Sequence, residues 1–318
     1  MTSETYHSLR QFGLSVARES LLTSWELIKI TVPVLIVTQL LVHFGVIDRL
    51  SGLLAPVMGL IGLPGALGLV WMTAMLTSLY GGIAVFAALS PGLDLTAAQV
   101  TILSSVMLIA HSLPLELSIS QKAGANFLPI GLLRLGGAIV YGMLLHYGCE
   151  LLQIWQQPVR LVFSQTDALP PGVLPWAGQQ LRNLAIMVII IAAIVVVMRL
   201  LRLAGILTRL ERFLAPVLPV FGMGQQAAPV TVVGMLMGIG YGGALIIRET
   251  CSGLMSRKEV FCSMALMGLC HGLIEDTLLM AAIGGKLGGI FWGRIVFSLA
   301  VIYVLVKLIN SFASSTPK

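Results

Sequence analysis

The sequence predicts an all-α, polytopic membrane protein built from two inverted repeats, each with three transmembrane helices and a re-entrant hairpin. Three observations predict it. Of the 318 residues, 57% are hydrophobic and only 10% are charged, and the mean hydropathy is +0.97. Several apolar segments reach the roughly 20 helical residues that a membrane crossing takes. The same rare polar features also occur twice, at a nearly constant offset.

The composition excludes several classes of protein. Soluble domains carry about 25% charged residues, so this chain cannot cover a water-facing surface. It is also not a disordered chain, a disulfide-rich secreted domain or a soluble nucleotide-binding fold. The net charge of +6 predicts basic residues that face anionic lipid rather than nucleic acid. The four cysteines form no CxxC pair, which indicates neither a zinc motif nor a disulfide framework.

The elements follow in order along the chain. The first 24 residues are polar or amphipathic, unlike a signal peptide, and predict an interfacial helix over 8–22. The apolar segments expected to cross the membrane are 29–47, 96–117, 127–149, 181–201, 258–283 and 287–309. The expected parts are an N-terminal amphipathic segment 1–24, a first repeat 25–149, an extracytoplasmic linker 150–180, a second repeat 181–310 and a C-terminal tail 311–318.

Two further apolar stretches, 64–90 and 226–255, are each interrupted by Tyr-Gly-Gly. Arms of about 8–14 residues cannot each cross a core of about 30 Å at 1.5 Å per residue. Glycines at the interruption allow a tight reversal of the chain. We therefore expect each stretch to be a re-entrant hairpin with Tyr-Gly-Gly at its tip.

The repeat rests on features that chance matches of Leu and Ala do not explain. RLSGLLAP at 49–56 recurs as RLERFLAP at 209–216. Tyr80-Gly81-Gly82 recurs as Tyr241-Gly242-Gly243 at an offset of 161, and the pairs His111/His271, Glu116/Asp276 and Arg134/Arg294 recur at an offset of 160.

Basic residues distinguish the orientation of the two halves. The stretch after the first apolar helix carries only Arg49 in the first half, whereas its counterpart carries Arg199, Arg202, Arg209 and Arg212. Equivalent loops that differ in this way are expected on opposite sides of the membrane. This favours inverted repeats with both termini cytoplasmic. The alternative is eight full crossings with parallel repeats.

The candidate functional residues lie in 110-AHSLPLELSISQK-122 and 270-CHGLIEDTLLMAA-282. Ionisable groups inside a membrane cost roughly 2.5–3.5 kcal/mol or more, so they usually face a partner or a cavity. Pro114 is expected to break the first helix, and Gly272 allows the same in the second. His271 and Glu275 are spaced to share one helical face. A histidine beside a carboxylate can form a proton relay.

Other interpretations of these residues stay open. Arg134 and Arg294 are expected to form structural ion pairs with Glu116 and Asp276 that fasten neighbouring helices. The tyrosines at the hairpin tips either line a site or, like the glycines, serve the turn. Sulfur and imidazole ligands in the second half suit transition metals. With Glu275 and Asp276, the side chains of Cys270, His271 and nearby methionines allow a metal site as an alternative.

The duplicated RLxxxLAP unit, the YGG hairpin and the HSLPLE or CHGLIED helix resemble the Gate-domain family of nucleoside recognition proteins. That group is related to spore maturation proteins A and B, the concentrative nucleoside transporters and the membrane part of B-type ferrous iron permeases. The resemblance covers roughly residues 25–310. It implies a central site in which hairpin tips and broken helices hold a solute together with a coupling Na⁺ or H⁺.

We therefore expect a multi-pass protein of the cell membrane, the inner membrane in a bacterium. The predicted function is secondary transport of a small polar solute, for which a nucleoside is one candidate, coupled to H⁺ or Na⁺. The sequence contains no P-loop, GxSxG or HExxH motif, so nothing in it indicates an enzyme or another cofactor.

The expected partners are the lipid bilayer and the solute, not nucleic acid, and a homo-oligomer stays open. The alternatives are a divalent metal permease and a non-transporting scaffold. The expected substrate site consists of Tyr80, Gly81, Gly82, His111, Glu116, Tyr241, Gly242, Gly243, His271, Glu275 and Asp276.

Overall fold

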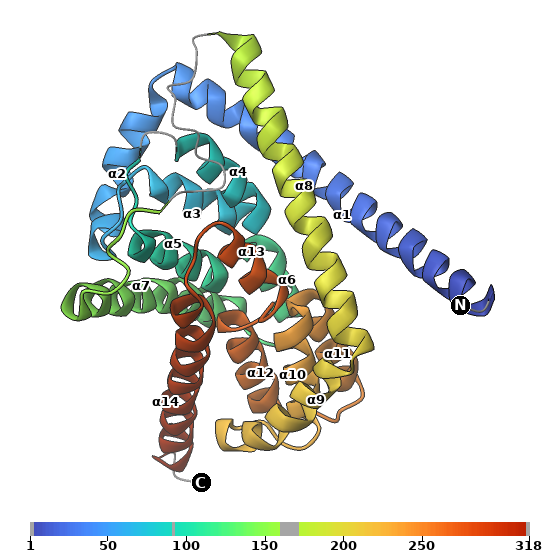
Figure 1. Ribbon diagram of the computed structural model, residues 1–318. Helices are drawn as coiled ribbons and strands as arrows, with labels where there is room; N and C mark the ends of the chain where they lie inside the picture. Colours follow the sequence, from blue (N-terminus) through green and yellow to red (C-terminus); the bar gives the residue numbers. More distant parts are fainter. Residues whose placement is uncertain (1–2, 91–92, 160–171, 316–318) are drawn as a thin grey trace.

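The computed structural model describes residues 3–90, 93–159 and 172–315, and the regular elements of these residues are helices (Figure 1). The elements of the first half are α1 (Ser3–His43), α2 (Val46–Leu60), α3 (Leu67–Leu76), α4 (Leu79–Leu89), α5 (Ala97–Ile109), α6 (Leu113–Lys122) and α7 (Phe127–Leu152). Those of the second half are α8 (Val173–Leu203), α9 (Ile206–Leu214), the 3₁₀ helix η1 (Ala215–Phe221), α10 (Ala227–Met237), α11 (Ile239–Cys251), α12 (Arg257–Leu269), α13 (Glu275–Ala282), the π-helix η2 (Gly288–Gly293) and α14 (Arg294–Ser315).

Among the described residues, four segments are long and apolar enough to cross a membrane: 97–122, 127–152, 174–203 and 288–311. The first of them joins α5 and α6. The expectation of a separate interfacial helix over 8–22 is wrong, because α1 runs without a break from Ser3 to His43. The apolar part of α1 also ends earlier than expected, because Gly45 adopts a left-handed conformation with φ of +64°.

Apart from η1 and η2, which among the described residues occur only in the second half, the two halves present the same kinds of helix in the same order. In each half a long helix and a short helix precede a hairpin of two short arms, a broken helix and a final long helix. Even the capping boxes repeat, with Thr96 and Gln99 at the start of α5 and Ser256 and Glu259 at the start of α12. The halves interlock, because α6 packs against α11 and α7 packs against α12 (Figure 1).

The two ends of each hairpin lie close together. The Gln99 amide donates to the Gly62 carbonyl at 3.2 Å, and the Gly224 amide donates to the Glu259 carboxylate at 3.0 Å. These two bonds join the chain before each hairpin to the chain after it. The described arms have 10, 11, 11 and 13 residues.

The reversal of each hairpin lies before Tyr-Gly-Gly, which corrects the expected tips. It falls at Thr77 and Ser78 in the first hairpin and at Gly238, with φ of +96°, in the second. Tyr-Gly-Gly forms the first turn of α4 and of α11, where its glycines allow the two arms to approach closely. A Cβ on Gly242 would lie 2.3 Å from the Cα of Gly234.

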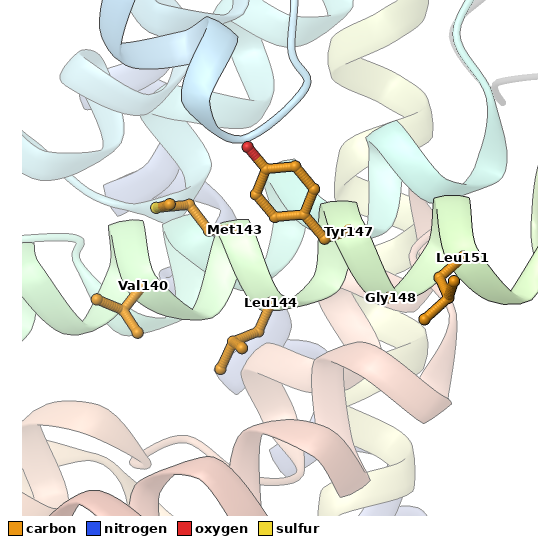
Figure 2. Close-up of a pocket in the computed structure, with 6 residues that line it drawn as sticks. All are labelled: Val140, Met143, Leu144, Tyr147, Gly148 and Leu151. Atoms are coloured by element: carbon orange, nitrogen blue, oxygen red, sulfur yellow. The ribbon is translucent and has the colours of Figure 1, made fainter.

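An apolar hollow of about 440 Å³ lies along one side of α7 (Figure 2). It is lined by Val140, Met143, Leu144, Tyr147, Gly148 and Leu151. A surface of this kind suits lipid chains, and it brings together no charged groups. The candidate site therefore lies elsewhere, in the interior.

Candidate functional site

The site is built on two helix breaks, one in each half. Between α5 and α6, Ser112 adopts a left-handed conformation with φ of 46°, and between α12 and α13 Gly272 does the same with φ of 56°. Each break is bonded to the end of the first hairpin arm of its own half. The Ser112 amide donates to the Ala74 carbonyl at 2.9 Å, and the Leu273 amide donates to the Met235 carbonyl at 3.0 Å.

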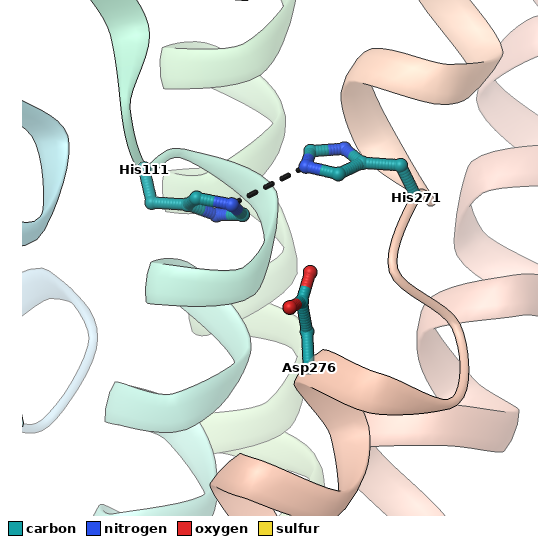
Figure 3. Close-up of side chains that lie close together, drawn as sticks. All are labelled: His111, His271 and Asp276. Carbon is teal, nitrogen blue, oxygen red and sulfur yellow. Dashed lines mark hydrogen bonds between the residues drawn. The ribbon is translucent and has the colours of Figure 1, made fainter. Parts of the chain in front are cut away.

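The breaks bring the imidazole rings of His111 and His271 into direct contact in the interior (Figure 3). Their Nε2 atoms lie 3.2 Å apart, and the two residues are 6% and 2% exposed. Each Nδ1 faces a backbone carbonyl four residues earlier, that of Met107 at 2.9 Å and that of Met267 at 2.7 Å. Because a carbonyl only accepts hydrogen bonds, both Nδ1 atoms carry hydrogen. A neutral ring therefore presents a bare lone pair at Nε2.

Glu116, in the first turn of α6, joins the two histidines. Its Oε1 lies 3.2 Å from His271 Nε2 and 3.4 Å from His111 Nε2. Its other oxygen pairs with Arg134 of α7, so the expected Glu116–Arg134 pair is present. The fully buried Arg134 also donates to the carbonyls of Ile109 at 2.9 Å and of His111 at 3.0 Å. One guanidinium thus holds both the carboxylate and the open end of α5.

The second half is arranged differently. A potential ligand atom of Asp276 and one from each histidine all lie within 4.8 Å of one another. No salt bridge joins Asp276 to Arg294 within the described part of the chain, which corrects the expected pairing. Arg294 instead donates through Nη2 to Thr277 Oγ1 at 3.3 Å, and its Nε and Nη1 are buried without a hydrogen-bond partner in the described residues.

The hairpin tyrosines do not share one environment. Tyr80 is partly buried, and Glu275 and Asp276 are close enough to act on its phenol electrostatically. Tyr241 is 55% exposed and lines a separate pocket with Arg202 and Glu211. The glycines that follow both tyrosines are buried.

Two further expectations change. His271 and Glu275 do not share a helical face, because the chain is broken between them and α13 begins only at Glu275. Cys270 is buried, with its thiol against Ser298, and does not belong to the His111–His271–Asp276 group. Sequence reasoning missed the direct contact of the two histidines. Their equal offset in the repeat is the signal that could have indicated it, because equivalent residues meet where two related halves meet.

Paired broken helices that bring charged side chains together in an apolar interior are typical of polytopic membrane proteins that handle solutes or ions. The Gate family, described as nucleoside recognition, matches residues 24–123, which end just after α6. An uncharacterized membrane protein of Bacillus subtilis (strain 168), YvoD, is 30% identical over 270 residues, which cover 82% of this chain and 83% of the relative. No solved structure matches. The chain belongs to the Gate family of membrane proteins.

Proposed function

We propose that the protein is a secondary transporter of a small polar solute and that the solute passes where the two broken helices meet. One observation carries the proposal. Four ionisable side chains, His111 and Glu116 from the first half and His271 and Asp276 from the second, converge in the interior. Such groups are costly within a membrane and usually mark a substrate or ion pathway.

The proposed topology has six crossings and two re-entrant hairpins, with inverted halves and both termini cytoplasmic. The short hairpin arms support it, because 10–13 helical residues reach only about 15–20 Å at 1.5 Å per residue. The bonds that join the two ends of each hairpin also support it. At the start of α12, Lys258 bonds Asn310 of the C-terminal helix at 2.5 Å, which agrees with a basic cytoplasmic end.

Thiol labelling in cells tests this topology. Cys251 is exposed, whereas Cys149, Cys262 and Cys270 are buried. We expect a membrane-impermeant maleimide to label Cys251 only after permeabilisation. In a Cys251→Ser background, Gln157→Cys is expected to label in intact cells. Parallel repeats with eight crossings place both positions on the same side, so labelling of both under one condition would contradict the inverted topology.

The family description, nucleoside recognition, supports a nucleoside-like solute. We further propose that its transport is coupled to H⁺ or Na⁺. A panel of nucleosides and nucleobases, each with and without Na⁺, is tested for thermal stabilisation of the purified protein and then for uptake into proteoliposomes. A ligand at 100 times its Kd stabilises by about 2.7 kcal/mol. We expect Glu275→Gln, which removes a carboxylate charge that acts electrostatically on Tyr80 of the first hairpin, to lower uptake at least ten-fold.

His146→Ala is the control, because His146 lies on α7 near Glu150 at 3.7 Å and outside the cluster. It is expected to retain uptake. A solute that stabilises the protein but does not accumulate in proteoliposomes would contradict transport. The absence of stabilisation by every nucleoside and nucleobase would contradict the nucleoside-like substrate.

A further inference from the structure

We propose that His111, His271, Glu116 and Asp276 form a four-coordinate site for one divalent transition-metal cation. The inference deepens the proposed function, because it names the class of cation held where the solute is proposed to pass. It rests on that function for its role in transport, although the binding of the metal can be measured without transport.

The first argument is the orientation of the lone pairs. Both Nδ1 atoms donate to backbone carbonyls, so the Nε2 atoms of neutral rings carry no hydrogen. These two nitrogens converge on Glu116 Oε1, which accepts only. Three lone pairs within 3.2–3.4 Å of one another repel unless a proton or a metal cation lies among them. A histidine whose other nitrogen donates to a carbonyl is also the usual metal-ligating arrangement.

The second argument is the size of the triangle. Bonds from Zn²⁺ to imidazole nitrogen and carboxylate oxygen are about 2.0–2.1 Å, so neighbouring ligands in a tetrahedron lie about 3.3–3.4 Å apart. The three edges between His111 Nε2, His271 Nε2 and Glu116 Oε1 are 3.2, 3.2 and 3.4 Å. One ion therefore reaches all three atoms with little movement of the side chains.

Asp276 supplies the fourth ligand. Its carboxylate points toward the gap between the two imidazoles (Figure 3) and lies within 4.8 Å of them. It packs so closely over Gly272 that a Cβ there would lie 1.7 Å from Asp276 Oδ2. Because Asp276 has no salt bridge to Arg294 in the described residues, its carboxylate can turn toward an ion without breaking a pair.

The donor set selects the class of cation. Mg²⁺ and Ca²⁺ prefer shells made of oxygen, whereas two imidazoles with carboxylates suit Zn²⁺ or Co²⁺. Glu116 is held by Arg134, and ligating carboxylates are commonly hydrogen-bonded in this way. The histidines come one from each half, so the ion would connect the two halves.

Cobalt titration of the purified full chain tests the proposal. After chelator treatment and desalting, Co²⁺ is added and the visible spectrum is recorded. Four-coordinate Co²⁺ absorbs far more strongly in the visible than six-coordinate Co²⁺. We expect strong bands that saturate at one ion per chain and disappear when excess Zn²⁺ is added. Weak bands typical of six-coordinate Co²⁺ would overturn the proposal. The absence of bands would also overturn it and is the result expected for a cluster that holds only a proton.

Variants identify the ligands. His111→Ala and His271→Ala are expected to abolish the bands, and His146→Ala is expected to preserve them. Asp276→Asn keeps the size of the side chain and breaks no ion pair seen in the described residues, so it tests the site even where a histidine variant fails to fold. We expect it to weaken Co²⁺ binding at least ten-fold. Unchanged bands in folded His271→Ala or Asp276→Asn protein would overturn the proposed ligand set.

The two proposals fail separately. Strong saturable Co²⁺ bands in a protein that takes up no solute would support the metal site and contradict transport. Solute uptake by a protein that shows no Co²⁺ bands would support transport and overturn the metal site.

Discussion

Replacement of Arg134 by methionine is expected to lower the free energy of unfolding by roughly 3–5 kcal/mol. Arg134 is fully buried, pairs with Glu116 and donates to the carbonyls of Ile109 and His111. Without the guanidinium, a buried carboxylate and two helix-end carbonyls lose their partner. Thermal unfolding of the purified variant in detergent measures the loss.

Arg294→Met is the matched control, because Arg294 is the repeat-related residue and is equally buried. Its only hydrogen bond within the described residues is 3.3 Å long, to Thr277, and two of its nitrogens have no partner there. Removal of unsatisfied donors is nearly neutral, so we expect a loss of about 1 kcal/mol or less. Equal losses in the two variants would contradict the asymmetry between the halves.

Gly272→Ala is expected to lower the affinity for Co²⁺ at least ten-fold. Gly272 has φ of 56°, and its missing Cβ leaves room for the Asp276 carboxylate. A methyl group there displaces Asp276 from the histidines. The left-handed conformation adds about 1–3 kcal/mol of destabilisation in a non-glycine residue. Titration with Co²⁺ and thermal unfolding separate the two effects.

Ser112→Ala provides the comparison in the other half. Ser112 already carries a Cβ in the same backbone conformation, and its hydroxyl donates to the Thr77 carbonyl at 3.0 Å. The variant loses that bond, worth about 1 kcal/mol, and moves no carboxylate. We expect its affinity for Co²⁺ to stay within about two-fold of the wild type. A ten-fold loss here as well would mean that any change at the breaks, rather than the displaced Asp276, weakens binding.

The sequence indicated the all-helical membrane class and the break before Pro114, because apolar length and a proline act locally. It also indicated the Glu116–Arg134 pair, because the residues recur in the repeat at a shared spacing. The hairpin tips were misplaced. The glycines of Tyr-Gly-Gly are needed for close packing of the arms, and a pattern of glycines does not distinguish a turn from a close contact.

The differences between the halves could not be derived from the repeat. Equivalent positions predicted equivalent pairs, yet Glu116 binds its arginine and Asp276 turns to the histidines. The direction of a short carboxylate depends on the local backbone, here the left-handed Gly272 beneath it. The contact of His111 with His271 depends on how the halves assemble, so the repeat could have indicated it, whereas no local pattern encodes it.

That contact has an electrical consequence. In the proposed inverted topology, the axis that relates the two halves lies in the membrane plane, and equivalent atoms 3.2 Å apart must lie beside it. A divalent ion at this point has crossed about half of the membrane voltage from either side, which is equivalent to moving one elementary charge through all of it. At 100 mV this is about 2.3 kcal/mol, or roughly 50-fold in occupancy. The membrane potential would then favour loading from one face and unloading to the other.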